Sequence, residues 1–404
     1  MNDTSVAGTT GYLSRAQEYA LAVTVAVVTA NAYYIHPIIG KVAASFGVSE
    51  ARIGIVPALN QLALALGILL LLPLGDFYSN KRLTILFVSA QCLFMLGMAL
   101  ADDFLLFTAA STALGFVTIA PYLLPAFASK RVAPERLGQV TALLTAGVIF
   151  GILVARVGAG VVAEHFGWRA VYWCAFAFMV GVTVFLPVAM RTEAAATKRA
   201  QSSYAGLIGS VFKLAKAHPD TMLSAAIQAL NFAAFTATWL ALALHLTGPE
   251  LGYGVDTVGY LAGLSAISIF TTPRLGSWAD RVGPYRARLI CAVVQLCGIA
   301  LFYPLGWSVW ALLVPLVLVN LVGPTIDVTG RMTFLALEPA IRTRLTTAYI
   351  VTMFIGGAVG SILGTSVFDH FGWAGTCAML SVFSASVIAL SWLAVRREKV
   401  VTPA

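Results

Sequence analysis

Two charged side chains lie inside long apolar segments, where a charge is costly. Asp327 is the one carboxylate well inside such a segment, and Arg156 is the one basic residue inside another. Ionisable groups in apolar spans usually face a protein interior or a pathway, so they are the first candidates for chemistry. Asp327 could bind and release a proton, and Arg156 could neutralise an anionic ligand.

Both residues also have a structural interpretation. Asp327 lies four residues before Arg331, the spacing of an ion pair on one helix face. It also lies roughly 25 Å along its segment at 1.5 Å per residue, near one membrane surface. Arg156 lies near one end of its segment, from which a long side chain can reach the headgroups.

Amide, aromatic and histidine side chains supply further candidates. In segments 20–35, 222–246 and 309–328 they recur at helical spacing and form polar stripes. The predicted lining of a substrate cavity is Asn31, Tyr34, Asn60, Gln61, Arg156, Gln228, Asn231, Trp239 and Asn320. The predicted proton-coupling groups are Asp327, His36 and His245, since histidine titrates near neutral pH, although a lone interfacial histidine is often structural.

The elements that must position these residues are membrane spans. The chain is 59% hydrophobic and only 10% charged, which predicts an integral membrane protein. Twelve apolar runs approach the length of about 20 residues that a spanning helix needs, and none alternates as a barrel strand would. They cover 20–35, 53–74, 83–100, 104–127, 140–162, 170–189, 222–246, 258–272, 289–305, 309–328, 346–368 and 375–395. We therefore predict an all-α fold with twelve transmembrane helices.

The basic residues predict how these helices are oriented. With both termini on the cytoplasmic side, 21 of the 25 Lys and Arg fall in cytoplasmic loops and tails, as the positive-inside rule requires. The formal charge of +8 is thereby assigned to membrane topology, and a nucleic-acid partner is not expected. Both termini are predicted to be cytoplasmic.

Landmarks recur at a constant separation. Asp76 and Asp280 are 204 positions apart, and the two copies of His-Phe-Gly-Trp, which end at Trp168 and Trp373, are 205 apart. Such a period indicates two similar halves. We expect six-helix bundles at 1–190 and 221–404, joined by a cytoplasmic linker at 191–220 that contains an amphipathic helix over 204–216 or is simply solvated.

The loop at 276–283 reads G-S-W-A-D-R-V-G and resembles the signature loop of the major facilitator superfamily. Segment 74–82 is a weaker copy. Twelve spans in two repeats agree with this resemblance, which covers essentially the whole chain. Segments 134–136, 151–156 and 167–173 are similar to bacterial drug and sugar efflux proton antiporters.

The resemblance implies roles for the two loops and for four spans. Asp76, Asp280 and Arg281 would latch the cytoplasmic side when the transporter opens outward, and the first, fourth, seventh and tenth spans would line a central cavity. The first loop departs from the family pattern at Leu72, Phe77 and Ser79. Ile152 stands where antiporters carry the proline of a Gly-Pro pair, and Ser111 where an arginine is common, which weakens the antiporter subtype.

These observations predict a secondary transporter of the bacterial inner membrane that exports a small organic compound in exchange for protons. One alternative is proton-coupled or facilitated uptake of a small organic anion, motivated by Arg156, and another is a non-transporting receptor on the same fold. No phosphate loop, metal-ligand cluster or catalytic motif is present, so we expect no enzyme, cofactor or metal site. The expected partners are the substrate and the bilayer, with the proton gradient as energy source and a monomer as the working unit.

Overall fold

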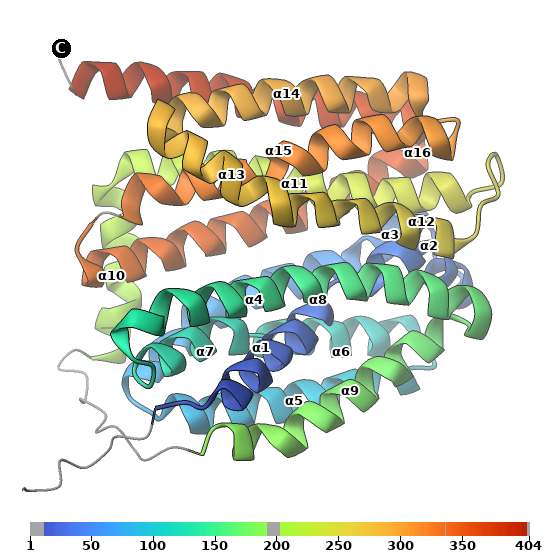
Figure 1. Cartoon of the computed structure of the whole chain (residues 1–404). Helices are drawn as coiled ribbons and strands as arrows, with labels where there is room; N and C mark the ends of the chain where they lie inside the picture. Colours follow the sequence, from blue (N-terminus) through green and yellow to red (C-terminus); the bar gives the residue numbers. More distant parts are fainter. Residues whose placement is uncertain (1–11, 192–202, 336, 402–404) are drawn as a thin grey trace, which may run out of the picture.

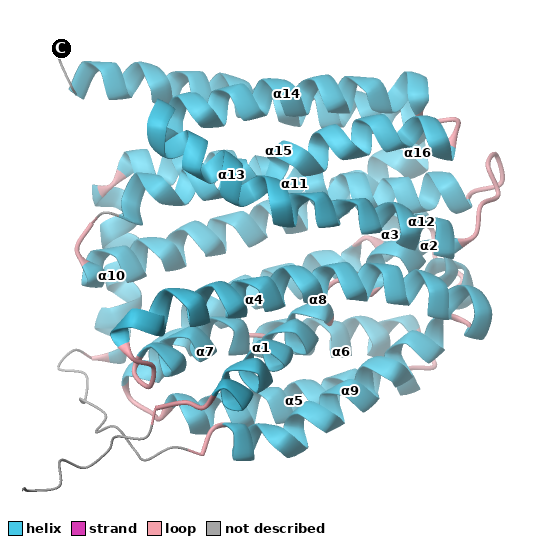
Figure 2. Ribbon diagram, in the orientation of Figure 1, coloured by secondary structure: helices cyan, strands magenta, loops and turns pink. Residues whose placement is uncertain are grey.

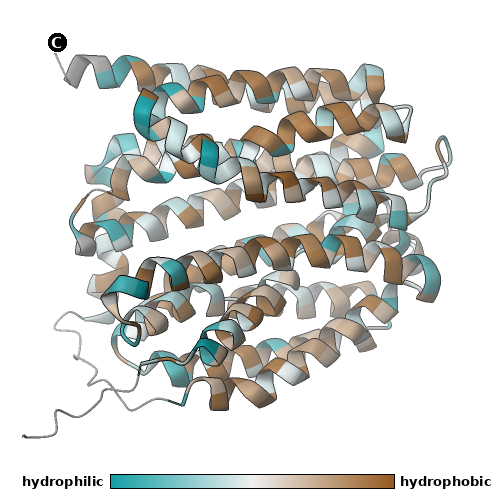
Figure 3. Cartoon of the chain, viewed as in Figure 1, coloured by the Kyte–Doolittle hydropathy of each residue, from teal (hydrophilic) through white to brown (hydrophobic). Residues whose placement is uncertain are grey.

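The computed structural model describes residues 12–191, 203–335 and 337–401. Over these ranges the chain is made of helices and short connections, without a strand (Figure 2). Polar residues gather mostly toward the helix ends, whereas the middles of the helices are largely hydrophobic (Figure 3). This distribution is what a lipid environment requires, because backbone groups are satisfied inside each helix and apolar side chains face the hydrocarbon.

The first half contains six spans. They are α1 (Arg15–Ala30) with α2 (Ile35–Phe46); α3 (Glu50–Ile53) with α4 (Ile55–Leu71) and η1 (Leu72–Asp76); α5 (Asn80–Leu100); α6 (Phe104–Val117) with α7 (Ala120–Ser129); α8 (Leu137–Phe166), preceded by η2 (Pro134–Arg136); and α9 (Trp168–Ala189). The breaks inside the first, second and fourth spans are short and stay within a single crossing.

The second half repeats this arrangement. Its elements are α11 (Pro219–Thr247); α12 (Val255–Gly263) with η3 (Leu264–Ala266) and α13 (Ile267–Val282); α14 (Pro284–Leu305); α15 (Val309–Leu335); and α16 (Pro339–Val401). Eleven helices of the described chain are long and apolar enough to cross a membrane, and the last of them, Ile341–Glu398, has 58 residues. That length is about twice that of the other spans, which have 21 to 32 residues.

α16 crosses twice because its helix is broken at Gly372, where φ is 61° and ψ is −158°. Arg344 near its start and Arg397 near its end contact α10 and α11 at the same end of the molecule. Gly167, 205 positions earlier, has φ 82° and separates α8 from α9. Only glycine adopts such positive φ values readily, so the repeated Phe-Gly-Trp motif is the hairpin turn of both halves. The prediction of twelve transmembrane helices is confirmed.

The signature loop at 276–283 is shorter than the sequence indicated. α13 continues to Val282 and α14 begins at Pro284, so Asp280 and Arg281 lie on a helix and the turn consists of Gly283, with φ 90°. Proline suits the first position of a helix because it needs no N–H partner there. The polar residues of this segment therefore extend a helix beyond the apolar run.

α10 (Tyr204–Ala217) occupies the segment where an amphipathic linker helix was expected. Leu207 and Val211 on its apolar face are buried, and the Tyr204 hydroxyl donates to the Leu70 carbonyl at 2.6 Å. Arg344 of α16 donates to the Ser210 hydroxyl. The linker helix thus packs on protein from both halves.

Glycines allow close helix contacts within each half. An added Cβ at Gly151 of α8 would overlap the carbonyl oxygen of Ala26 on α1, and one at Gly360 of α16 would overlap that of Ala233 on α11. Close approach between small residues is a common mode of helix association in membranes. Gly158, on the same helix as Gly151, has open space around it and makes no such contact.

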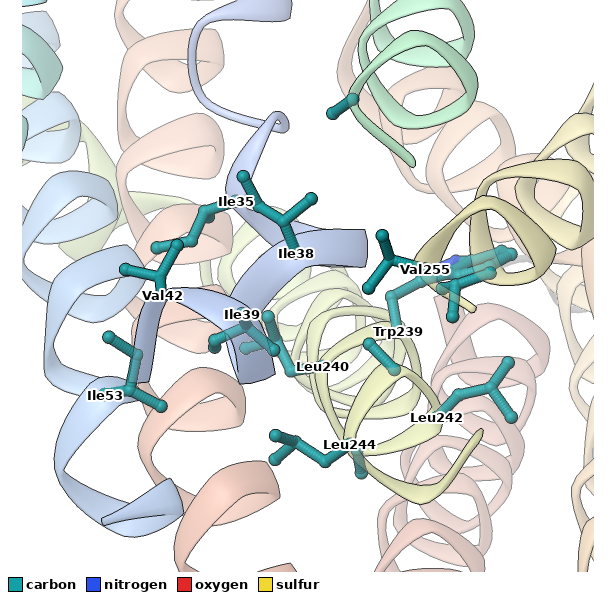
Figure 4. Packing of buried hydrophobic residues seen from close by; sticks show 14 of the residues in the cluster. Ile35, Ile38, Ile39, Val42, Ile53, Trp239, Leu240, Leu242, Leu244 and Val255 are labelled. Atoms are coloured by element: carbon teal, nitrogen blue, oxygen red, sulfur yellow. The ribbon is translucent and has the colours of Figure 1, made fainter. Parts of the chain in front are cut away.

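The two halves share two buried apolar clusters, one of which lies at one end of the bundle. We call this end, which carries α2, α3 and α12, the hairpin end, and the opposite end, which carries α10, the linker end (Figure 1). α2 packs against α11 and α12, and α3 packs against α16. Figure 4 shows the shared apolar cluster, in which Ile39 of α2 lies beside Leu240 of α11. The structure is therefore a state with its hairpin end closed.

Candidate functional site

Arg156 is buried where the halves meet. Arg156 lies on α8 of the first half. Its guanidinium carbon is 4.6 Å from the ring centre of Phe235 and 4.7 Å from that of Trp239, both on α11 of the second half. Tyr33, in the break between α1 and α2, lies 5.3 Å away. Only 1% of Arg156 is exposed, so the side chain does not extend to the membrane surface. Aromatic faces attract a cation, which explains how these residues tolerate it.

His36 completes this cluster. Arg156 Nη2 lies 3.2 Å from His36 Nδ1. A guanidinium can only donate, so Nδ1 is the acceptor and the proton of the neutral imidazole lies on Nε2. His36 Nε2 is buried without a partner, as are Nε and Nη1 of Arg156. We call Tyr33, His36, Arg156, Phe235 and Trp239 the arginine cluster.

No carboxylate neutralises this arginine within the described chain. The ion pairs there join other residues, such as Lys41 with Glu164 and Arg331 with Asp327. A buried charge without a counter-charge costs several kcal/mol by order of magnitude, so one is rarely present without a use. Three unused donor positions and a positive charge form an arrangement that can accept an anion.

Most of the predicted cavity residues lie elsewhere. Asn60 donates to the Ser111 carbonyl at 2.7 Å inside the first half, and Asn31 contacts the Met179 sulfur at 3.2 Å. Tyr34 packs against the apolar cluster of the hairpin end, while Gln61 lies against Gly357 where the halves meet.

The predicted residues of the second half form their own contacts. Asn231 accepts a hydrogen bond from Gln295 at 2.8 Å and donates to Gln228 at 3.1 Å. Asn320 donates to the Leu316 carbonyl of its own helix. Of the nine predicted cavity residues, only Arg156 and Trp239 belong to the arginine cluster, and Gln228 and Asn231 meet in a separate contact within the second half.

Two of the three proton-coupling candidates already have close partners. Arg331 Nε lies 3.0 Å from both carboxylate oxygens of Asp327, and the Tyr349 hydroxyl donates to Asp327 Oδ1 at 3.0 Å. The His245 ring stacks on Trp373 with ring centres 4.4 Å apart, and its Nε2 lies 3.0 Å from the Gly306 carbonyl oxygen. Only the third candidate, His36, contacts Arg156.

Comparison with known proteins decides the family. A model of the Major Facilitator Superfamily matches residues 21–335 and 224–404. The chain belongs to this superfamily. It is therefore a multi-pass membrane transporter and not an enzyme, and its bacterial relatives suggest the inner membrane.

Relatives in the superfamily cover nearly the whole chain. An uncharacterized transporter, YgaY, of Escherichia coli O157:H7 is 26% identical over 387 residues, 96% of this chain and 98% of its own. The multidrug resistance protein MdtG of Dickeya zeae is 24% identical over 343 residues, 80% of each chain. The crystal structure of a mutant of the nucleoside transporter NupG superposes with a TM-score of 0.74 at 15% identity, over 94% of this chain and 99% of that chain. These matches favour transport over the receptor alternative.

The predicted latch residues of the two signature loops, Asp76, Asp280 and Arg281, are exposed in this state. Within the described ranges none of their side chains takes part in a hydrogen bond or an ion pair. The latch remains a prediction, and its contacts would have to form in another conformation of this superfamily member.

Sequence reasoning missed Tyr33 of the arginine cluster and placed a second buried arginine outside the spans. Tyr33 is adjacent to Tyr34, but the break between α1 and α2 shifts the helical spacing on which the prediction rested. Arg288 was assigned to a cytoplasmic loop, yet it is 0% exposed on α14 and donates to the Ser224 hydroxyl at 2.9 Å. The Gly283-Pro284 pair, a turn followed by a residue suited to a helix start, is the sequence signal that would have placed Arg288 on α14.

Proposed function

We propose that this transporter moves a small organic anion across the membrane by alternating access, with Arg156 as the group that binds the anion. The observation that carries this proposal is a guanidinium that lies between the two halves, is 1% exposed, has two nitrogens without partners and contacts no carboxylate in the described chain. An anion would supply both the counter-charge and the missing hydrogen-bond acceptors.

The position of the arginine cluster between the halves supports the same function. Tyr33 and His36 belong to the first half, and Phe235 and Trp239 belong to the second. In alternating access the two halves rock around a site that lies between them, so such a motion would move these two walls apart. The aromatic walls favour an organic anion over a small inorganic one, since they offer apolar surface next to the charge.

Binding of organic acids tests the proposal. Purified protein in lipid nanodiscs is titrated with aliphatic and aromatic monocarboxylates and with their uncharged amides. We expect Arg156→Gln to lose acid binding by at least tenfold, whereas Arg286→Gln, a change at an exposed arginine, retains it. Equal binding of acids and amides, or acid binding that survives Arg156→Gln, would overturn the proposal.

Proton-coupled efflux of a neutral or cationic compound is the second candidate. It is favoured by the relationship to MdtG, a multidrug resistance protein, over 80% of each chain. Efflux would be supported over anion transport if a compound drives proton movement in proteoliposomes and Asp327→Asn abolishes that movement. The direction of transport, the proton gradient as energy source, cytoplasmic termini and a monomeric unit stay predictions under both functions.

A further inference from the structure

We infer that His36 takes up a proton together with the anion, so that Arg156 and His36 form one site that carries an organic anion and a proton as a pair. The inference rests on the proposed function, in which Arg156 binds an organic anion. It assigns the coupling proton to the neighbour of the anion and not to Asp327.

The contacts of His36 define its electrostatic surroundings. Helices α3, α8, α9, α11 and α12 pack against α2. Within these helices, the titratable or charged groups of the hairpin-end portions are Glu50 and Arg52 on α3, Arg156, Glu164 and His165 on α8, Arg169, Tyr172 and Cys174 on α9, His245 on α11, and Asp256 and Tyr260 on α12, while Lys41 lies on α2 itself. Within the described chain, only Arg156 and Tyr33 make a hydrogen bond or a ring contact with His36. No carboxylate in these ranges is in contact with the imidazole to neutralise an added proton.

Protonation of His36 changes what Arg156 can do. The neutral ring accepts the Arg156 hydrogen bond with the lone pair of Nδ1, and a proton on Nδ1 removes that acceptor. Two buried cations would then lie side by side and repel each other. In the absence of an anion, protonation therefore costs both a hydrogen bond and a charge repulsion.

A bound carboxylate reverses this balance. Its oxygens can accept from Nε and Nη1 of Arg156, which lack a partner in the described chain, and its negative charge favours a proton on the adjacent imidazole. The anion then neutralises one cation and attracts the other. Because linkage is reciprocal, an anion that favours the proton on His36 is itself bound more tightly when that proton is present.

The proton balance is simple. One proton leaves the solution on the side of entry, forms a bond to Nδ1 of His36, and returns to the solution on the other side when the anion leaves. A monocarboxylate and one proton carry no net charge together, so their combined transfer is electroneutral. Asp327 is less suited to this role because it already binds Arg331 and Tyr349 and does not contact Arg156.

Proton uptake during ligand binding tests the inference. Benzoate, chosen for its carboxylate and aromatic ring, is added to the protein in nanodiscs at pH 7 in weak buffer with a pH indicator. We expect the wild type to take up close to one proton per benzoate bound. His36→Asn, which keeps a hydrogen-bond acceptor for Arg156 but cannot titrate, should take up none, and His165→Asn, at an exposed histidine, should behave as the wild type.

The wild-type protein supplies a measurement that does not depend on how well the variant folds. Its benzoate affinity should fall by up to tenfold per pH unit as the pH rises above neutrality. Binding that requires Arg156 but shows neither proton uptake nor pH dependence would overturn this inference and leave the proposed function intact. Proton uptake that persists in folded His36→Asn would also overturn it, whereas benzoate binding that survives Arg156→Gln would overturn the proposed function itself.

Discussion

The Glu164 carboxylate of the first half accepts a hydrogen bond from the Val255 backbone N–H of the second half, at 3.1 Å. Val255 is the first residue of α12, so the carboxylate lies at a helix N-terminus, where a negative charge is stabilised. The same oxygen binds Lys41 Nζ at 2.8 Å. This contact joins the halves at the hairpin end, which is closed in this structure.

Glu164→Gln should weaken that closure. Loss of the charge at the start of α12 and of the ion pair with Lys41 is expected to cost about 0.3–1 kcal/mol, roughly a twofold to fivefold change in the population of the closed state. In a background without native cysteines, Ala262→Cys, which is 1% exposed on α12, should react faster with a thiol reagent when Glu164→Gln is present. Glu250→Gln, at an exposed residue near the same end, serves as the control. Equal reaction rates in all three proteins would show that Glu164 does not hold this end closed.

Gly151→Ala should destabilise the first half. Its Cβ would overlap the backbone carbonyl of Ala26, and backbone cannot move aside as a side chain can. Overpacking of this kind typically costs about 1–3 kcal/mol. Gly158→Ala, on the same helix but facing open space, should be neutral or slightly stabilising. Thermal unfolding in detergent compares the two, and an equal melting temperature would contradict the close contact between α1 and α8.

Asp327→Asn should lower stability without changing how anion binding depends on pH. The substitution removes a two-oxygen contact with Arg331 in a partly buried setting, which we expect to cost about 1–3 kcal/mol. Asp220→Asn removes a looser pair with Arg397, 3.7 Å apart and half exposed, and should cost less than about 1 kcal/mol. Thermal unfolding and benzoate binding between pH 6 and 8 check both statements. A flattened pH dependence in Asp327→Asn would transfer the coupling role from His36 to Asp327.

Asp280→Asn should favour the state described here. Asp280 is exposed and makes no hydrogen bond or ion pair within the described ranges, so the substitution removes nothing from this conformation. If the latch forms when the linker end closes, the variant weakens that other state by about 1–3 kcal/mol, the usual size of such a bias. Cysteines introduced at the linker end should become more reactive, and Asp76→Asn should act in the same direction. Unchanged labelling in both variants would count against a latch at these positions.

Much of the fold could be predicted because membrane spans are encoded locally. Each apolar run must satisfy its own backbone hydrogen bonds, so length and composition indicate a helix without knowledge of its neighbours. The 205-residue period similarly identified Gly167 and Gly372 as equivalent before their positive φ values were known. The boundaries were less accurate, since polar residues such as Asp280 and Arg288 continue helices beyond their apolar runs.

The site was only partly predictable, for a physical reason. A charge in an apolar run is costly in hydrocarbon, so the sequence identified Arg156 and Asp327 equally as site candidates. The difference between them lies in partners that are distant in sequence or set by side-chain geometry. Asp327 binds Arg331 and Tyr349, whereas Arg156 lies among aromatic rings of both halves and lacks a carboxylate partner in the described chain.

By itself the sequence determined that this is a twelve-span membrane protein of two related halves, since hydropathy and internal repeats are properties of the chain alone. Only the tertiary structure decided which polar residues come together as the candidate site. Asn31, Asn60, Asn231 and Asn320 make their hydrogen bonds within their own halves, while Arg156, which is hydrogen-bonded to His36, contacts Trp239 of the other half. Contacts between helices depend on how the two halves pack. The periodicity of α2, α8 or α11 alone does not predict the packing that brings these three helices together.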